Sequence, residues 1–436
     1  MIIDFSVTNF GPIKSEQTLS FEATADTTLE DYYIHEPIPG LRLLKFAMLY
    51  GPNASGKSTV LEAIEFLRDL VLDPLEKKSD TLSFQPFLFD ESTPDESSML
   101  KISFVKNAIK YQYIVEFNKS FILKEQMFYY PKGRQAEFFT RNTNTDNSLS
   151  SISFGSTVKV AKNNLIVLTG NTISNNTLLG AYLKSNVDIP ELHTIFDWFA
   201  ENLMALINPN QNLFSWTSNK IDEDNDFRKK VLEIINKADV QINDIEIDEK
   251  VEILKESDIT ELAELVDIDN LEQLKKDKKI VLKNILFHHN VINNDKSETY
   301  KLPKQFESLG TKRFYELSGV LVTLIEGDKV SYIDEIESSL HSDLMKHFIL
   351  MHLVNSTSSQ LLITTHNLSL LDEKDILRND AIWFTQKLKD GSTDLYSLVD
   401  FDSSTFRKGA SIINSYKIGK LGAIPDFGNI FLKEVL

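Results

Sequence analysis

Residues 48–64 read MLYGPNASGKSTVLEAI, and within them the pattern GxxxxGK[ST] runs from Gly51 to Ser58. Glycines at this spacing let the backbone curl so that successive N–H groups point toward phosphate oxygens, and the helix that follows adds its positive dipole end. Lys57 would reach the β- and γ-phosphates of a nucleotide, and the Ser58 hydroxyl would bind Mg²⁺. The predicted phosphate-binding residues are Gly51, Pro52, Asn53, Ala54, Ser55, Gly56, Lys57, Ser58 and Thr59.

The residues on either side of this loop have the patterns expected of a strand and a helix. Residues 43–51, LLKFAMLYG, form an apolar run that is typical of a strand buried on both faces. Downstream, apolar residues recur at steps of three and four from Leu61 to Val71, which indicates an amphipathic helix. A chance turn would need all three features to coincide, so we expect the loop to bind a nucleotide.

A second apolar strand ends in two carboxylates. In residues 329–341, KVSYIDEIESSLH, Asp334 stands at the carboxyl end of the strand and Glu335 follows it directly. By itself this pair is equally consistent with a helix cap or a surface turn. Nucleotide hydrolysis, however, needs a metal-binding carboxylate beside the phosphate loop and a group that activates water. We therefore predict that Asp334 holds Mg²⁺ and that Glu335 polarises the attacking water.

A histidine follows the next strand along the chain. Residues 360–367 read QLLITTHN, and His366 comes directly after the apolar run. A lone histidine in this position is usually structural, but here it would act as a hydrogen-bond donor to a γ-phosphate. Ligands of open α/β sheets bind at the carboxyl ends of the strands, where the loop, the two carboxylates and His366 would meet.

The remaining patterns divide the chain into three parts. Residues 1–185 begin with an alternating hairpin, contain further alternating strands between 100 and 140, and include an apolar run, LIVLTG at 165–170, that predicts a short strand. Residues 186–300 predict a helical, acidic insert whose carboxylates, crowded between 243 and 273, are most simply a solvated face. Residues 301–436 alternate strands with helices, which predicts parallel strands with crossover helices.

The composition limits the classes of partner and compartment. The chain has 64 acidic and 46 basic residues, a formal charge of −18, so any nucleic-acid contact must be a local patch. No cysteine occurs, which removes disulfides and thiolate chemistry and is consistent with a reducing compartment. Neither a secretory signal nor a membrane-spanning run is evident, so we expect a cytoplasmic protein without a membrane partner.

Several stretches together resemble ABC-type ATPase heads of the RecF/SMC class, in particular bacterial proteins related to the OLD and abortive-infection ATPases. They are IIDFSVTNFGPI, GPNASGKST, ESLGTKRFYEL, YIDEIESSLH, TTHN and SYKIGKLGAIP. The resemblance implies an α/β fold of the P-loop NTPase type, similar to ABC ATPases. It would have a mixed or parallel core sheet, an antiparallel amino-terminal β lobe and a helical insert. It also implies ATP and Mg²⁺ as cofactors. ATP is favoured over GTP because no guanine-reading motif of the [NT]KxD type occurs in a convincing position.

The resemblance also assigns four further residues. Ser308 and Gly310 fall in the signature segment, which would meet the γ-phosphate of ATP held by another subunit. His341 replaces the usual aspartate of the segment that crosses the dimer interface. Gln85, in FQPFLFD, could be the metal-sensing glutamine, but its loose spacing fits a glutamine at a strand edge better.

The resemblance implies an ATP-sandwiched homodimer or higher oligomer that switches a separate effector, such as a nuclease or toxin, in bacterial phage defence. Only about 35 residues follow Asp402, too few for the nuclease domain of OLD-type proteins. One alternative is a DNA-repair or chromosome-maintenance ATPase that binds DNA directly, which the overall acidity argues against. The other is a nucleotide-bound scaffold without catalysis, which an intact Glu335 argues against.

Overall fold

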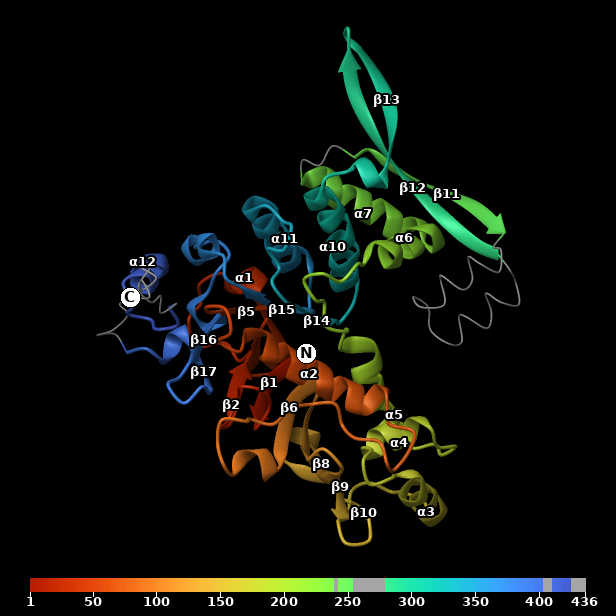
Figure 1. The fold of residues 1–436 in the computed structure, drawn as a ribbon, viewed down its shortest axis with the longest axis vertical. Helices are drawn as coiled ribbons and strands as arrows, with labels where there is room; N and C mark the ends of the chain where they lie inside the picture. The colour runs from red at the N-terminus through yellow and green to blue at the C-terminus, as the bar shows by residue number, and fades with distance from the viewer. Residues whose placement is uncertain (239–241, 254–278, 403–409, 425–436) are drawn as a thin grey trace, which may run out of the picture. The chain divides into compact units, whose positions relative to one another are not determined.

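The computed structural model of the chain describes residues 1–238, 242–253, 279–402 and 410–424. Its residues form two units (Figure 1). The first unit comprises Met1–Gln211, Thr323–Ser338 and Phe348–Leu436, and the second comprises Asn212–Val322 and Ser339–His347. Segments from both ends of the chain therefore build the first unit, which contains the phosphate-binding loop.

The loop follows the central strand of a sheet with the order β14-β15-β5-β16-β17 among the described residues. Neighbouring strands from β14 to β16 are parallel, and β17 returns antiparallel to β16. This arrangement confirms the predicted parallel strands and the mixed core sheet. The strands are β14 (Val330–Ile333), β15 (Gln360–Thr365), β5 (Phe46–Tyr50), β16 (Ile382–Lys387) and β17 (Thr393–Ser397).

The sequence accounts for the burial of this sheet and of the helix after the loop. Every residue of β5 and β15 is buried, as expected for strands covered on both faces. Helix α2 (Lys57–Leu72) buries Leu61, Ile64 and Leu67 on one face, which confirms the predicted amphipathic helix. Each fully buried leucine contributes about 1.5–3 kcal/mol, so this face fixes the helix, and with it the loop, against the core.

The predicted antiparallel lobe is also present in the first unit. Strands β1 and β2 pair as a hairpin, with Phe5 opposite Leu19, and both side chains are buried. Among the described residues they belong to a sheet with the order β10-β9-β8-β7-β6-β1-β2. Its strands are β1 (Ile2–Thr8), β2 (Gln17–Ser20), β6 (Ser98–Lys106), β7 (Ile109–Phe117), β8 (Ile122–Tyr129), β9 (Ala136–Asn144) and β10 (Leu149–Phe154).

The strand predicted at 165–170 is wrong, because these residues lie inside helix α3 (Lys162–Asn171). Only Leu168 of this helix is buried, while Ile166 is 61% and Val167 41% exposed. A short apolar run is compatible with a helix or a strand, and its length alone cannot decide between them.

The second unit contains helices together with a sheet that the sequence did not predict. Helices α6 (Phe214–Glu223) and α7 (Asn225–Lys237) agree with the helical pattern of this region. The described residues add the antiparallel sheet β11-β12-β13, in which the long strand β12 pairs with both β11 and β13 (Figure 1). Its strands are β11 (Asp244–Ile253), β12 (Lys279–Asn293) and β13 (Lys296–Pro303). The acidic residues between 254 and 273 lie outside the described residues.

The remaining elements complete both units. Helix α10 begins in the second unit and ends in the first. Helix α11 does the same. The other elements are α1 (Glu30–Tyr33), β3 (Ile34–Ile38), β4 (Leu41–Leu44), α4 (Leu178–Leu183), α5 (Pro190–Asp197), α10 (Leu309–Glu326), α11 (Ser342–Asn355) and α12 (Ile412–Lys417).

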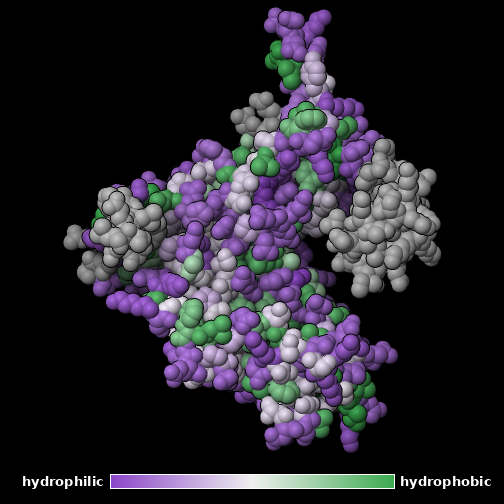
Figure 2. All heavy atoms as spheres, viewed as in Figure 1, coloured by the Kyte–Doolittle hydropathy of each residue, from purple (hydrophilic) through white to green (hydrophobic). Residues whose placement is uncertain are grey.

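The visible face of the molecule is mostly hydrophilic, with hydrophobic residues in small separate groups (Figure 2). This surface accords with the large share of charged residues, 25% of the chain. None of the helices in the described parts of the chain has the length and apolarity needed to span a membrane.

Candidate nucleotide-binding site

The phosphate-binding loop adopts the curled backbone that its glycines predict. Ala54 has a φ of 60°, and Gly56, at the start of α2, has a φ of 98°. A side chain at Gly56 would also collide with Thr393 of β17. Glycine is therefore required at this position by both the backbone conformation and the close packing, and the first turn of α2 opens directly onto the loop.

Lys57 extends its ammonium group across this loop. The side chain is buried, and Nζ donates to the carbonyls of Gly51 at 2.9 Å and Pro52 at 3.1 Å. Burial lowers the pKa of Lys57, and the nearby carboxylates of Glu335 and Asp334 oppose that shift. The sheet thus places the predicted lysine and both predicted carboxylates in one electrostatic cluster.

The register of the sheet explains why these groups meet. Tyr50 of β5 lies opposite Thr365 of β15, so the residues that follow, Gly51 and His366, leave the sheet at the same edge. Ile333 of β14 lies opposite Ile363, which sets Asp334 level with Thr364. The carboxyl ends of three strands carry the loop, Asp334 and His366, as predicted.

Thr364 connects the two predicted carboxylate residues, and the sequence analysis did not identify it. Its hydroxyl donates to Asp334 Oδ1 and accepts the backbone N–H of Glu335 at 2.8 Å. Glu335 has a φ of 46°, which is unusual for a residue other than glycine. Thr364 therefore holds Asp334 and fixes the turn at which Glu335 leaves the strand. Its place, two residues before His366, was the only available signal.

His366 is half exposed and faces a cavity beside the loop. Its carbonyl accepts a hydrogen bond from the Tyr50 hydroxyl at 2.9 Å, and burial raises the pKa of that hydroxyl far above its usual range. The cavity has a volume of about 830 Å³ and is also lined by Asn53 and Lys387. The histidine predicted to contact a γ-phosphate therefore borders an open space next to the phosphate-binding loop.

The residues present fit a magnesium nucleotide. The loop offers backbone N–H groups and the Lys57 ammonium, and Ser58 and Asp334 offer the oxygen ligands that Mg²⁺ prefers. In the described parts of the chain, no cluster of three or more histidine or carboxylate side chains is placed to hold a metal ion by itself. Ser58, Asp334 and a bound phosphate would therefore together supply the ligands of the predicted metal ion.

Ser308 and Gly310 belong to the second unit, at the start of α10. The Ser308 hydroxyl accepts the N–H of Thr311 at 3.0 Å, so Ser308 caps this helix and is itself exposed. A Cβ at Gly310 would lie 3.2 Å from the carbonyl of Ser339. The signature segment is therefore an exposed, capped helix start, and its role toward another subunit stays a prediction. His341, in the same unit, is likewise exposed.

Gln85 is exposed, and its side-chain oxygen accepts a hydrogen bond from Lys119 Nζ at 3.2 Å. Its backbone carbonyl accepts the N–H of Gly11 at 2.7 Å, and a Cβ at Gly11 would lie 3.0 Å from Thr59. The backbone of Gln85 therefore runs near the start of α2, while its side chain is engaged by Lys119. Its role as a metal-sensing residue stays a prediction.

Two threonines on the β16–β17 hairpin make polar contacts with Ser55 of the loop, and neither was identified from the sequence. Thr385 Oγ1 lies 2.6 Å from Ser55 Oγ, and Thr393 Oγ1 donates to the Ser55 carbonyl at 3.1 Å. A Cβ at Gly51 would lie 2.5 Å from Thr385. These contacts join segments more than 300 residues apart, so no local pattern announces them.

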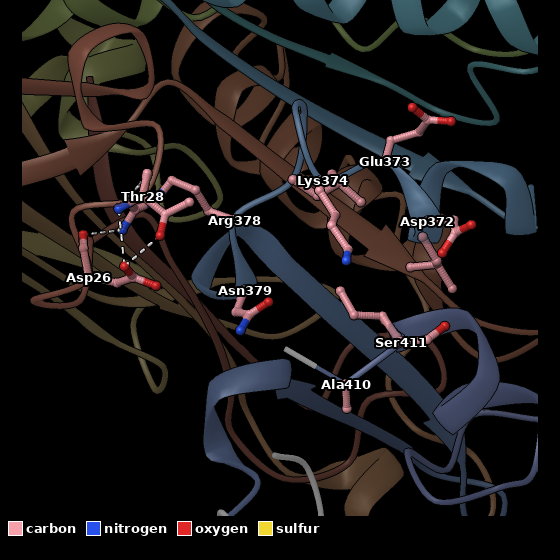
Figure 3. A pocket seen from close by; sticks show the side chains of 12 residues that line it. Asp26, Thr28, Asp372, Glu373, Lys374, Arg378, Asn379, Ala410 and Ser411 are labelled. Atoms are coloured by element: carbon pink, nitrogen blue, oxygen red, sulfur yellow. Dashed lines mark hydrogen bonds between the residues drawn. The ribbon is translucent and has the colours of Figure 1, made fainter. Parts of the chain in front are cut away.

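Figure 3 shows a second cavity, of about 250 Å³, whose lining includes none of these groups. Arg378 is one of the charged residues that line this cavity. Its guanidinium is buried and pairs with Asp380 at 2.8 Å. It also donates to the carbonyls of Thr28 and Asp26. Because its donors are used within the protein, Arg378 joins residues 378–380 to residues 26–28 and offers little to a ligand.

Comparisons with solved structures return SMC head domains. They include "SMC head domain from Thermotoga maritima" (10% identity, TM-score 0.41, covering 91% of this chain and 98% of that one). A second is the SmcHead bound to the C-winged helix domain of ScpA (12% identity, TM-score 0.42, 91% and 97% covered). A third is an Smc head with an extended coiled coil bound to the C-terminal domain of ScpA, derived from Pyrococcus furiosus (12%, 0.39, 96% and 98%). A comparison with curated proteins returns no match.

A family model matches residues 46–372, a range that contains the phosphate-binding loop, Asp334, Glu335 and His366. This match confirms the predicted ATPase-type P-loop fold. The chain belongs to the family described as "AAA domain, putative AbiEii toxin, Type IV TA system".

Proposed function

We propose that this protein binds and hydrolyses ATP, dimerises around the nucleotide and thereby switches a separate effector. The observation that supports it most directly is the buried Lys57 ammonium in the field of Asp334 and Glu335 at the edge where three strands end. A lysine for phosphate, a carboxylate for metal and a second carboxylate for water are the parts that phosphoryl transfer requires.

Each residue has a defined task in this reaction. When bound, Mg²⁺ would neutralise charge on the phosphates, with Ser58 and Asp334 among its ligands. Lys57 would exchange its two carbonyl partners for phosphate oxygens. Glu335 would accept a proton from water, and Thr364 keeps that residue at a fixed turn through the backbone N–H.

The proposed dimer follows from the exposed start of α10. Ser308 is capped to Thr311 and open to solvent, so it is available to a phosphate held by a second copy of the chain. A closed dimer would contain two ATP molecules, each between Lys57 of one copy and Ser308 of the other. Hydrolysis would remove the γ-phosphate and release the closed state.

The effector is proposed to be a protein, such as a nuclease or toxin, in phage defence. The family description names the AAA domain itself as a putative toxin of a type IV toxin–antitoxin system and does not refer to a separate effector. The chain's charge of −18 repels nucleic acid on average and favours a basic protein partner. Two conformational states can transmit to this partner only the difference in its affinity for them.

The central experiment uses Glu335→Gln, which keeps the size and hydrogen bonding of the side chain but removes the base. With ATP and Mg²⁺ we expect turnover to fall by on the order of 10² or more while binding persists. Light scattering should then find a stable dimer that the wild type forms only transiently. Monomers of this variant under the same conditions would contradict the dimer. Glu76→Gln, at an exposed position, is the matched control.

The effector is tested separately. The protein is expressed with and without its neighbouring genes, and the cells are challenged with phage. We expect protection to require a neighbour, and the purified protein alone to leave DNA and RNA intact. Protection by this protein alone, together with nucleic-acid cleavage by the purified chain, would overturn the separate effector.

A further inference from the structure

Glu337 contacts both the backbone and the imidazole ring of His366. Its Oε1 accepts the backbone N–H of His366 at 2.7 Å and lies 2.9 Å from the ring Nδ1. The Tyr50 hydroxyl holds the carbonyl of the same histidine at 2.9 Å. His366 is thus restrained at three atoms, two of them by one carboxylate oxygen.

In the described parts of the chain, the Glu337 carboxylate makes hydrogen-bond and ion-pair contacts with His366 alone. Its side chain is only 11% exposed, and Oε2 is buried without a hydrogen bond among the described residues. An ionised carboxylate can only accept hydrogen bonds, so Nδ1 of His366 carries a proton in this pair. The contact with Glu337 therefore places a proton on Nδ1, and Nε2 can donate to a phosphate only in the ring form that is protonated at both nitrogens.

The other ring nitrogen remains available. The His366 side chain is 52% exposed and borders the cavity of about 830 Å³ that Asn53 of the phosphate loop also lines. With Nδ1 committed to Glu337, only Nε2 can interact with a group that enters this cavity. A histidine free to rotate would instead present either nitrogen.

We propose that Glu337 is a positioning residue that holds Nδ1–H of His366, so that the doubly protonated ring directs Nε2–H at the γ-phosphate of bound ATP. The predicted effect of Glu337 on catalysis rests on the proposed ATPase function, whereas the predicted geometry of the His366 ring does not. Glu337 lies three residues after Asp334. One short segment therefore carries the metal carboxylate, the base Glu335 and the partner of His366, and a shift of that segment would move all three together.

The first test is spectroscopic and needs no catalysis. The full-length protein is labelled with ¹⁵N in the histidine rings, and among its eight histidines His366 is assigned by the signals that disappear in His366→Gln. We expect the chemical shifts of His366 without nucleotide to show a protonated Nδ1 in the wild type and in Glu337→Gln, whose amide oxygen can still accept. Glu337→Leu should lose this signature. A wild-type His366 protonated at Nε2 alone would overturn the proposal.

The second test is kinetic. Glu337→Leu should lower kcat by about 10- to 100-fold with KM for ATP nearly unchanged, because a histidine that contacts only the reacting phosphate contributes mainly in the transition state. Glu337→Gln should retain most of the activity, and Glu337→Leu should cause no further loss in a His366→Ala background. Independent, multiplicative losses would overturn the proposal. Thermal unfolding of each variant identifies any that fail to fold.

The two tests separate the two ideas. If the wild type binds ATP without hydrolysing it, the proposed function fails while the ring assignment is still decided by the spectra. If the spectra show the wrong protonated nitrogen while ATP is hydrolysed, the role of Glu337 fails and the proposed function stands.

Discussion

The hydroxyl of Thr385 lies 2.6 Å from the hydroxyl of Ser55, a residue 330 positions earlier in the chain. The contact ties the middle of the phosphate-binding loop to strand β16. Ser55 is almost fully buried, so its hydroxyl has no water to replace this partner. The conformation of the loop therefore depends in part on Thr385, which is not among the predicted nucleotide-binding residues.

Thr385→Val should weaken the loop without changing any predicted nucleotide contact. The substitution keeps the shape of the side chain but leaves the Ser55 hydroxyl unpaired, at a cost of about 1–2 kcal/mol in the free energy of unfolding. We also expect several-fold weaker ATP binding, measured by calorimetry. Thr140→Val, which removes an exposed hydrogen bond to Glu137, is the control. Equal effects of the two substitutions would contradict the role of Thr385.

Lys57→Ala should abolish tight ATP binding. The ammonium that now bonds to the carbonyls of Gly51 and Pro52 would be the main positive charge on the phosphates. We expect the affinity measured by calorimetry to fall by on the order of 10² or more, since charge-assisted contacts are lost. Lys77→Ala, at an exposed site outside the loop, should leave the affinity unchanged. Unaltered affinity in Lys57→Ala would refute the site itself.

Mixing two inactive variants tests whether Ser308 acts on the nucleotide of another copy. Ser308→Arg has an intact loop, and Lys57→Ala has an intact signature segment, so their heterodimer contains one complete site. A one-to-one mixture should recover about a quarter of wild-type turnover, given random pairing in a two-fold symmetric dimer. Pairing Lys57→Ala with the double variant Lys57→Ala/Ser308→Arg restores no site and is the control. Recovery no greater than in this control would remove the support for Ser308.

His352 should make the protein less stable as the pH falls. It is fully buried in α11, its Nε2 donates to the Lys45 carbonyl at 2.9 Å, and burial lowers its pKa from 6.5 to about 4. Between these values the unfolded chain binds a proton that the folded chain does not. Stability is therefore lost as the pH drops from 6.5 to about 4, by up to about 3 kcal/mol.

Urea denaturation across this pH range measures the effect. His352→Gln should flatten the dependence, whereas the exposed His193→Gln should leave it as in the wild type. Identical slopes for the wild type and His352→Gln would show that another group causes the loss.

The sequence alone determined those features whose chemistry depends on residues close together along the chain. A phosphate loop needs its glycines, Lys57 and Ser58 in one run, and the strand before it and the helix after it have local periodicities. Asp334 and His366 were found because each follows an apolar strand directly. In a parallel sheet the strand ends meet at one edge, which is why local patterns also predicted a shared site.

Where local patterns are ambiguous, the sequence was insufficient. The run at 165–170 is too short to distinguish a helix from a strand, and the structure makes it part of α3. In β11 the alternation of Ile245 and Ile247 with carboxylates was a genuine strand signal, but the crowding of charge favoured a helical interpretation. The partner strand β12 begins 26 residues after β11 ends, and such pairing leaves no local trace.

Only the tertiary structure decided which groups hold the site in place. Thr364, Thr385 and Glu337 are ordinary residues in their own segments, and each acquires a role through a partner on another strand or turn. A hydrogen bond depends on the distance between two atoms in space, while a sequence records only their separation along the chain. The groups proposed to react can therefore be predicted from the sequence, but the groups that orient them emerge only when the sheet brings its strands together.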